Sequence, residues 1–460
     1  MRRCGEPAVM LGLLGAFCLC SPLSAKQYRV SSAAAVAAVN EKLRPGDTVV
    51  MANGEWKNQA IWFSGQGTAA KSITLRAETA GKVVLEGKSS LTVTGENVVV
   101  SGLCFKNGRE ATNGILLEGH RCRLTDTAVI NGTYKFFLHL AGVENRVDHC
   151  YLAGKTSESP TLQVEVGSEP NHHRIDHNWF GHRAPLGRNG GETMRVGYSW
   201  QSMSNSATVV EENLFERCDG EIEIISSKSC ENVYRRNTFL DCAGMLTLRH
   251  GNRCVVENNF FIAHHTRGSG GIRVIGEGHK IINNYIDGVW QGGIWITAGI
   301  VDSPLIGYFQ AKNILVTSNT MVNCRGPCLD LNAGFGSSGR TLIPEKVVIT
   351  KNLFSVPKDG ELIKGTEGAG YKWGGNVVLA ESVGASAITP AVLKQTGARV
   401  VEMSVQRRAD GLWQPNPPKK RSGSEIGAGC DFAGFGSKLN RPLTGAEVGP
   451  AWMKGREPKS

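Results

Sequence analysis

The chain has 460 residues, of which 41% are hydrophobic, and it carries a formal net charge of +10. This length allows one large domain, and the charge fits a protein that meets a polyanion such as nucleic acid, acidic polysaccharide or a membrane surface. No basic run is interleaved with aromatic residues and no nucleic-acid-binding motif is present, so we expect no nucleic-acid partner.

The first 25 residues have the pattern of a secretory signal. A basic start is followed by an apolar run from about Ala8 to Cys20 and by small residues that end at Ala25. The apolar run is too short for a membrane span, and no later stretch approaches one. We therefore expect residues 1–25 to be removed and the protein to be exported to the periplasm or outside the cell.

An Ala-rich segment, SSAAAVAAVNEKL, follows the signal and ends at the turn sequence RPGD. Ser31 or Ser32 can cap its first turn, so the segment is predicted to be a helix. A helix here would cover the open end of a repeat protein, which otherwise exposes core and strand edges.

Short phrases of an asparagine, a spacer and an apolar residue recur along the chain. The core period is near 21 to 25 residues, and Val, Ile, Leu and Thr runs broken by Gly fill each period. Such repeats of short strands predict an all-β fold, a right-handed parallel β-helix, whose coils run from about Thr48 to about Val378. The repeated asparagines should form a ladder at one corner: Asn178, Asn213, Asn237, Asn258, Asn283, Asn319 and Asn352.

The asparagine phrases stop near residue 380, after which Gly, Pro and Lys become frequent. We therefore divide the mature chain into a parallel β-helix catalytic domain at 26–380 and a C-terminal extension at 381–460 that packs on it. A small separate C-terminal module is the alternative.

Ten of the thirteen cysteines follow the signal segment. Cys218, Cys242 and Cys324 share one position of their repeats, and Cys150 takes the asparagine position of its own repeat. These positions favour packed thiols over disulfides, and no Cys/His set has zinc spacing.

Two repeats are lengthened, between Asn178 and Asn213 and between Asn283 and Asn319. Loops that leave a rigid solenoid on one side form a cleft. The second loop carries aromatic residues that could stack on sugar rings or cover the core: Trp290, Trp295, Tyr308 and Phe309.

A group of charged residues lies in the middle repeats. Glu221 and Glu223 are two residues apart, so on a strand both point from one face, as hard-cation ligands do. Lys228 and Arg249 each lie nine residues before a ladder asparagine, and Arg273 lies ten before one, which predicts a column of three cations. Stacked like charges destabilise a sheet, so this column predicts an anionic ligand.

Three motifs here, NGGETMRVG from Asn189, GEIEIISSKS from Gly220 and LRHG from Leu248, resemble those of the chondroitinase B and alginate lyase family of polysaccharide lyases. The resemblance implies a calcium-bearing β-helix that cleaves uronate-containing polysaccharides by β-elimination. The family's metal ligands match Asn189, Glu221 and Glu223, its base matches Lys228, and its acid or charge-stabilising arginine matches Arg249. His250 and Arg273 match positions that line its substrate groove.

Two other functions remain open at this point. A pectinase-like hydrolase needs clustered aspartates, yet Asp219, Asp241 and Asp330 are not in phase with one another. A noncatalytic β-helix that binds polysaccharide would accept Arg in place of Lys228, whereas a base needs an amine that can lose its proton.

Alginate and dermatan sulfate both present uronates to such a site. A sulfated chain asks for additional cations, and few are evident beyond Arg249 and Arg273. Alginate is therefore the favoured partner, with a dermatan sulfate (chondroitin B) lyase as the alternative.

Overall fold

The computed structural model describes residues 24–109, 112–357, 360–379, 389–415, 428–430 and 441–455. The predicted signal peptide therefore lies, apart from its last two residues, outside the described residues. Within the described ranges no helix is both long and apolar enough to cross a membrane.

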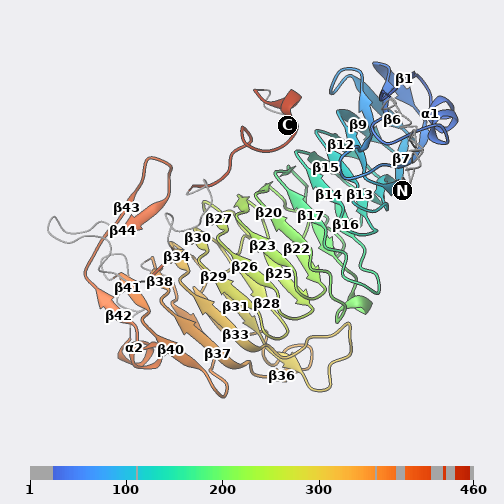
Figure 1. Cartoon of the computed structure of the whole chain (residues 1–460). Coiled ribbons are helices and arrows are strands. Elements are labelled where there is room, and N and C mark those ends of the chain that lie inside the picture. The colour runs from blue at the N-terminus through green and yellow to red at the C-terminus, as the bar shows by residue number, and fades with distance from the viewer. Residues whose placement is uncertain are drawn as a thin grey trace, which may run out of the picture.

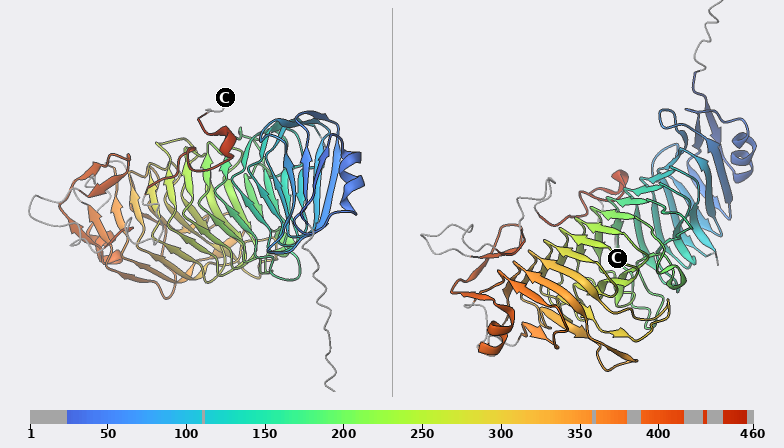
Figure 2. Two further views of the ribbon diagram at one scale, coloured as in Figure 1. Left: turned by 45° about the horizontal axis from the view of Figure 1, so that its top comes forward. Right: turned by 60° about the horizontal axis from the view of Figure 1, so that its bottom comes forward.

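Short strands wind in successive coils into three long parallel sheets, called A, B and C here (Figures 1 and 2). From β2 to β41 each coil contributes one strand to each sheet, so strands that are neighbours in a sheet lie one coil apart. The predicted fold, an all-β parallel β-helix, is confirmed.

The bounds follow sheet by sheet. Sheet A consists of β1 Gln27–Val30, β2 Thr48–Met51, β5 Ile73–Ala77, β8 Val98–Ser101, β11 Arg123–Thr125, β14 Arg146–Asp148, β17 Arg174–Asp176, β20 Val209–Glu211, β23 Val233–Arg235, β26 Val255–Glu257, β29 Lys280–Ile282, β33 Lys312–Thr317, β37 Glu345–Thr350 and β40 Lys372–Gly374. Sheet B consists of β3 Gly54–Lys57, β6 Val83–Gly87, β9 Leu103–Gly108, β12 Ala128–Gly132, β15 Tyr151–Lys155, β18 Trp179–Phe180, β21 Leu214–Glu216, β24 Thr238–Leu240, β27 Phe260–Ile262, β30 Tyr285–Asp287, β34 Thr320–Val322, β38 Leu353–Ser355, β41 Val377–Leu379 and β42 Arg399–Val401. Sheet C consists of β4 Ala60–Gln66, β7 Ser90–Glu96, β10 Asn113–Leu117, β13 Phe136–Leu140, β16 Leu162–Val164, β19 Met194–Val196, β22 Glu223–Lys228, β25 Met245–His250, β28 Ile272–Val274, β31 Ile294–Thr297, β35 Leu329–Ala333 and β39 Ile363–Lys364.

The core is the space enclosed by the three sheets. Because side chains alternate along a strand, one set of each strand points inward and stacks on the equivalent residue of the next coil. Four phenylalanines form such a stack, with ring centroids 4.7, 4.8 and 4.5 Å apart: Phe180, Phe215, Phe239 and Phe261. The inward rows therefore bury one continuous apolar column.

The asparagine ladder forms at the corner between sheets A and B. Each side-chain oxygen accepts from the backbone N–H and the amide of the asparagine one coil earlier, at about 3 Å. Its members are Asn178, Asn213, Asn237, Asn259, Asn284, Asn319, Asn352 and Asn376.

Two predicted ladder positions are wrong by one residue, because the phrases at Asn258 and Asn283 each contain two adjacent asparagines. The second of each pair enters the ladder. The first asparagine of each pair, Asn258 or Asn283, has a positive φ and stays at the surface. There the Asn283 amide donates to Asn258 Oδ1 at 2.9 Å. The predicted place of Cys150 is confirmed, since its N–H bonds to Asn178 Oδ1 at 2.9 Å.

Both ends of the coil stack carry a helix. At the N-terminal end α1, Ala33–Asn40, is capped by the Ser32 side chain and buries Val36, which confirms the predicted capping helix (Figure 1). At the other end α2, Pro390–Thr396, precedes β42, which pairs with β41. Coil strands thus continue past residue 380, where the sequence predicts the extension to begin.

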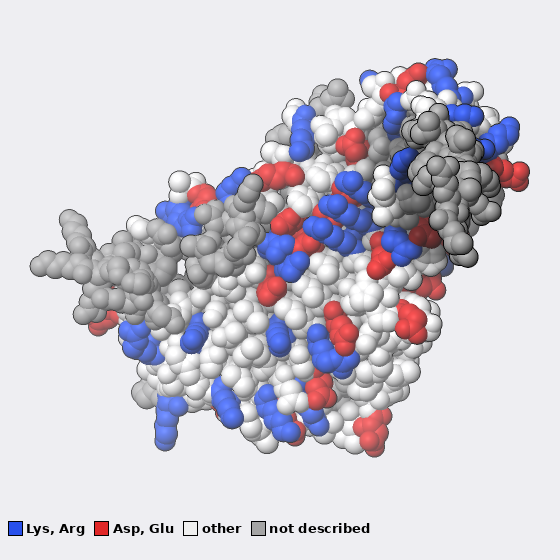
Figure 3. Space-filling model, viewed as in Figure 1, with Lys and Arg blue, Asp and Glu red and all other residues white. Residues whose placement is uncertain are grey.

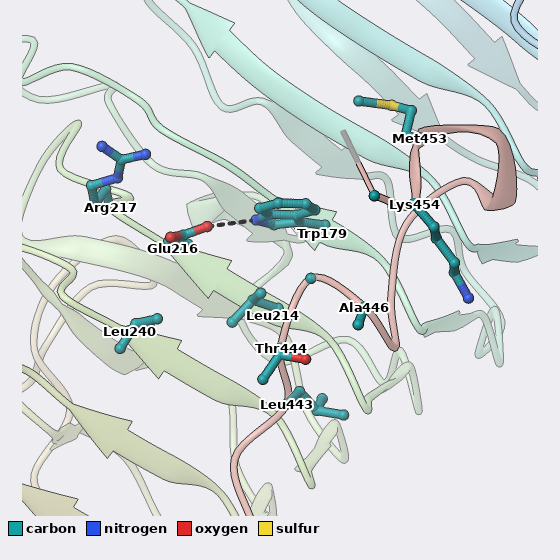
Figure 4. Close-up of a pocket in the computed structure, with 12 residues that line it drawn as sticks. Trp179, Leu214, Glu216, Arg217, Leu240, Leu443, Thr444, Ala446, Met453 and Lys454 are labelled. Carbon is teal, nitrogen blue, oxygen red and sulfur yellow. Dashed lines mark hydrogen bonds between the residues drawn. The ribbon is translucent and has the colours of Figure 1, made fainter. Parts of the chain in front are cut away.

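The C-terminal segment returns along sheet B toward earlier coils (Figure 2). Leu443 N–H donates to Thr238 Oγ1 at 2.8 Å, and Trp452 Nε1 donates to the Asp126 carbonyl at 2.9 Å. Its short helix η4 spans Ala451–Met453. Between this segment and sheet B lies an open pocket of about 620 Å³ beside Trp179, whose Nε1 donates to Glu216 (Figure 4).

Nine of the described cysteines are buried free thiols. Cys218 and Cys242 lie on consecutive coils, with the Cys218 N–H 3.4 Å from Cys242 Sγ. They occupy the packed positions that the sequence predicts.

Candidate active site

The candidate site lies on the outward face of sheet C, on four consecutive strands. Arg195 comes from β19, Lys228 from β22, Arg249 from β25 and Arg273 from β28. Since inward rows of these strands fill the core, the alternate residues face outward and form one row across the coils. That row is Gln163, Arg195, Ser226, Thr247, Arg273, Trp295, Asp330 and Lys364.

The predicted column of three cations is wrong in its register. Lys228 pairs with His250, and Arg273 pairs with Thr247, so Arg249 lies beside the Lys228 row. A β-bulge after Ser227 shifts the pairing. The ladder register agrees with this pairing. Asn259, and not Asn258, belongs to the ladder, and the residue nine positions before Asn259 is His250.

The two arginines still converge, because both face one carboxylate. Arg273 Nη1 lies 3.7 Å and Arg249 Nε 4.0 Å from Glu223 Oε1. The other oxygen of Glu223 accepts from Ser226 Oγ. This carboxylate therefore joins the cations of two coils.

A second carboxylate, Glu221, precedes β22, and the exposed Ile222 separates it from Glu223. Its Oε2 accepts from the Gly190 N–H at 3.2 Å, while its Oε1 is buried with no hydrogen-bond partner among the described residues. Burial, followed by Glu192 and Glu223, raises the pKa of Glu221 to about 8. Glu221 thus keeps a buried carboxylate oxygen without a partner within the described ranges, beside two other carboxylates.

The buried side chain of Arg183 holds the turn that contains Gly190. Its guanidinium donates to the Glu192 carbonyl and, at 3.3 Å, to the Gly190 carbonyl. Gly190 has a φ of 98°, a conformation that favours glycine. Asn189, the residue before it, is exposed, and its side chain makes no hydrogen bond within the described ranges.

The donor set at Glu221 fits a hard cation. It offers carboxylate oxygens of Glu221 and Glu223 and the amide of Asn189 nearby in the chain, the oxygen donors that calcium prefers. The unpartnered Glu221 Oε1 and the like charges around it are what a divalent ion would satisfy. In the described part of the chain, no group of three His, Cys, Asp or Glu side chains is placed to hold a metal ion by itself, so the Asn189 amide or substrate oxygens would complete the shell.

Lys228 is largely buried, with its Nζ 3.9 Å from Glu192 Oε1. Burial lowers the pKa of Lys228, and Arg195 and Arg249 lower it further against the effect of Glu223 and Glu192. A lysine with a lowered pKa can carry a neutral amine closer to working pH, as a general base requires.

Arg249 reaches from sheet C to the loop between β32 (Gly299–Ile300) and β33. Its Nη1 donates to the Gly307 carbonyl at 2.7 Å, and its guanidinium lies 4.1 Å from the ring centroid of Tyr308. The short antiparallel pair of β32 and β36 (Arg340–Leu342) anchors this loop. The second predicted insertion thus covers one side of the site, and one of its aromatic residues holds Arg249.

His250 is buried next to Arg249 and Lys228. Its Nδ1 lies 3.3 Å from Arg249 Nη1, and its Nε2 has no hydrogen-bond partner among the described residues. Burial and these two cations lower the pKa of His250 to about 3. The imidazole is therefore neutral at working pH and a weak base, which leaves Lys228 as the stronger candidate.

Three further charged residues lie in this region; the motif resemblance implies a structural role for Glu192 and Arg195, whereas no sequence pattern indicated Arg340. Glu192 and Arg195 lie 3.5 Å apart and next to Lys228, and Arg340 lies over the ring of Tyr308. Glu192 could be found from the sequence because it belongs to the NGGE motif. Arg340 could not, because only the folding of its segment brings it to the site. Asp219 and Asp241 lie at the corner between sheets B and C, before β22 and β25, whereas Asp330 lies on β35, several coils further along sheet C.

The Chondroitinase B family profile matches residues 30–369. The chain belongs to the Chondroitinase B family. The family predicted from the three motifs is thereby confirmed. A search of curated proteins finds no match.

Solved structures of similar proteins include the PL6 family alginate lyase AlyGC, with 33% identity over 94% of this chain and a TM-score of 0.83. The chain spans 60% of the length of AlyGC. A mannuronic acid specific polysaccharide family 6 lyase from human gut microbiota is also 33% identical, over 82% of this chain and 92% of that one, with a TM-score of 0.73. The PL6 polysaccharide lyase Pedsa3628 from Pseudopedobacter saltans is 25% identical over 92% of this chain and 99% of that one, with a TM-score of 0.72.

Proposed function

We propose that the protein is an exported polysaccharide lyase that cleaves alginate by calcium-assisted β-elimination and leaves 4,5-unsaturated uronate ends. The observation that carries this proposal is the meeting of a largely buried lysine of lowered pKa, Lys228, with Arg249 and with the carboxylates Glu221 and Glu223 at one face of sheet C. The family and its lyase relatives support the same reaction.

The chemistry requires a base and a countercharge. The C5 proton of a uronate is weakly acidic, and its removal places a second negative charge on the carboxyl group. Lys228 is the proposed base, and Arg249 the proposed stabiliser of the developing charge, since an arginine stays protonated. His250 and Arg273 would contact the substrate beside them.

Asn189, Glu221 and Glu223 are the residues proposed to hold calcium. The ion, when bound, would neutralise the substrate carboxylate and stabilise its enolate-like form. Gly190 and Arg183 keep Glu221 in place, while Ser226 orients Glu223.

Alginate is preferred to dermatan sulfate because the additional arginines near the site have protein partners. Arg195 Nε donates to Gln163 Oε1 at 2.6 Å. Arg340 Nη2 donates to Ser337 Oγ at 2.6 Å and stacks on Tyr308. Cations already engaged in this way are poor ligands for sulfate groups.

The test is incubation of the purified protein with alginate, dermatan sulfate and pectate, followed by ultraviolet absorbance and product sizing. Alginate should yield a conjugated unsaturated product. Saturated ends would indicate a hydrolase, and retention on alginate without cleavage would indicate a noncatalytic binder. Sequencing the N-terminus of secreted protein tests the proposed export and removal of residues 1–25.

A further inference from the structure

Trp200 is the most exposed large apolar side chain in the described part of the chain, with 65% of its surface accessible. It belongs to the short helix η1, Ser199–Gln201, which follows β19 in the first insertion. Tryptophan is enriched at binding surfaces, because its large ring offers much contact area and has few rotatable bonds. Its exposure here therefore marks this insertion as a candidate contact surface.

The indole is the outer member of a stack of three groups. The rings of Trp200 and Tyr198 have centroids 4.4 Å apart and planes 9° apart, and the Arg195 guanidinium carbon lies 4.9 Å from the centre of the Tyr198 ring. Because Tyr198 covers one face of the indole and 65% of Trp200 is still accessible, the opposite face is open to solvent.

Hydrogen bonds hold this helix against the sheet. Gln201 Oε1 accepts from the Tyr198 N–H at 3.0 Å, and Gln201 Nε2 donates to the carbonyl of Val166, just after β16. The Gln201 N–H also donates to the Tyr198 carbonyl at 2.8 Å. A ring that is already fixed in this way loses little conformational entropy when a ligand stacks on it.

The stack begins in the candidate active site. Arg195 stands in the outward row of β19, one coil before β22, and lies 3.5 Å from Glu192, which lies 3.9 Å from Lys228 Nζ. Met203 of the same insertion shares a pocket of about 390 Å³ with Phe309 of the second insertion. A sugar chain that extends from Lys228 toward the earlier coils therefore comes next to the stack, since neighbouring coils are about 4.8 Å apart.

We propose that Trp200 is a sugar-binding platform that holds a uronate ring of the alginate chain away from the bond that is cleaved, an inference that rests on the proposed function for its ligand. The faces of a pyranose ring present C–H bonds, whose partial positive charge meets the negative face of the indole. Hydroxyl and carboxylate groups stay at the ring edge in water, so stacking desolvates no charge. The contact is the same in the ground state and the transition state, so it lowers KM without changing kcat.

Kinetics on alginate separate a platform from a support for Arg195. Trp200→Ala should raise KM by about 10-fold and leave kcat within about twofold of wild type. Trp200→Phe keeps an aromatic face, so its KM should stay within about threefold. Trp62→Ala is the matched control, because Trp62 is 54% exposed on the same sheet, on β4, with β7, β10, β13 and β16 between it and β19. It should change neither constant by more than about twofold.

Fluorescence measures binding without turnover. In the Lys228→Arg background, in which the proposed base is absent, alginate should change the tryptophan emission. Adding Trp200→Ala should remove that change and weaken retention on alginate, whereas adding Trp62→Ala should leave both as they were.

An unchanged KM in Trp200→Ala overturns the platform, and so does a loss confined to kcat, which would indicate a support for Arg195. An equal rise in KM from Trp62→Ala also overturns it, because the effect would then not belong to the cleft. A wild type that binds alginate through Trp200 and forms no unsaturated product supports the platform and overturns the lyase function. The two proposals can thus fail separately.

Discussion

Two charged surfaces of the same β-helix are built in opposite ways. On sheet A, a row of arginines runs beside a row of carboxylates, and each acid pairs with arginines of the neighbouring row: Asp148 lies 2.6 Å from Arg123 and 3.5 Å from Arg146, and Asp176 lies 2.6 Å from Arg146. Figure 3 shows Lys and Arg side chains interleaved with Asp and Glu over this part of the molecule. Beside sheet C, Glu221 lies near Glu192 and Glu223 and keeps a buried oxygen without a partner in the described part of the chain.

The difference separates stability from function. Paired charges satisfy one another, and the surrounding cations and hydrogen bonds hold the pKa of Asp148 far below its ordinary value although burial opposes this. Grouped charges of one sign cost stability until a ligand arrives. We therefore expect changes on sheet C to alter activity and changes at the paired positions to alter unfolding.

The largest effect is expected from Lys228→Arg. It keeps the positive charge but removes an amine that can act as a base, so turnover should fall by about 1000-fold while substrate binding persists. Initial rates of unsaturated product and binding of alginate to the variant measure the two separately. Product formation near the wild-type rate would exclude Lys228 as the base. Arg249→Lys should be milder, because the charge that stabilises the intermediate remains.

Removal of calcium should have the second-largest effect on activity. Chelation should lower the rate by about 100-fold, and added calcium should restore it. Glu221→Gln should lose both the activity and the rise in melting temperature that calcium gives the wild type. Glu78→Gln, which breaks the exposed pair with Arg29, is the control. Full activity in a demonstrably metal-free preparation would show that the cations of sheet C suffice without calcium.

The ladder offers a test in which stability changes and activity does not. Asn259→Ala leaves the buried donors of Asn237 unpaired, so the free energy of unfolding should fall by about 3 kcal/mol. Asn258→Gly keeps the positive φ of its surface position and should cost about 0.5 kcal/mol. Denaturant unfolding compares them, and equal losses would contradict the ladder register.

The smallest effect is expected at His177, which precedes Asn178 of the asparagine ladder. Hydrogen bonds to Asp176 and Glu212 raise the pKa of His177 from 6.5 to about 9. The stability it contributes is fully present below pH 6.5 and is lost as the pH rises through about 9.

His177→Asn, which tolerates the positive φ there, should therefore destabilise the protein more in weak acid than in alkali. Melting temperatures across this pH range measure the difference, with the exposed His182→Asn as the control. A difference that is constant with pH would show that the charge of His177 does not stabilise the fold.

Much of this protein could be predicted from its sequence. Repeated asparagine phrases and short β-branched runs determine a β-helix, because identical turns and alternating strands can bury their apolar residues only by stacking. The motifs at Asn189, Gly220 and Leu248 likewise indicated the family and the seven candidate site residues. The capping helix followed from its Ser cap and Ala-rich face.

Register and distant contacts needed the tertiary structure. Two adjacent asparagines at 258 and 259 are equivalent as letters, and only packing selects the one that enters the corner, so Lys228 faces His250 instead of Arg249. Tyr308, on the loop after β32, and Arg340, on β36, lie far along the chain from Arg249, and no local sequence pattern specifies that they meet it. Strand alternation determines which face a residue takes, whereas bulges and loop folding decide which charges finally meet.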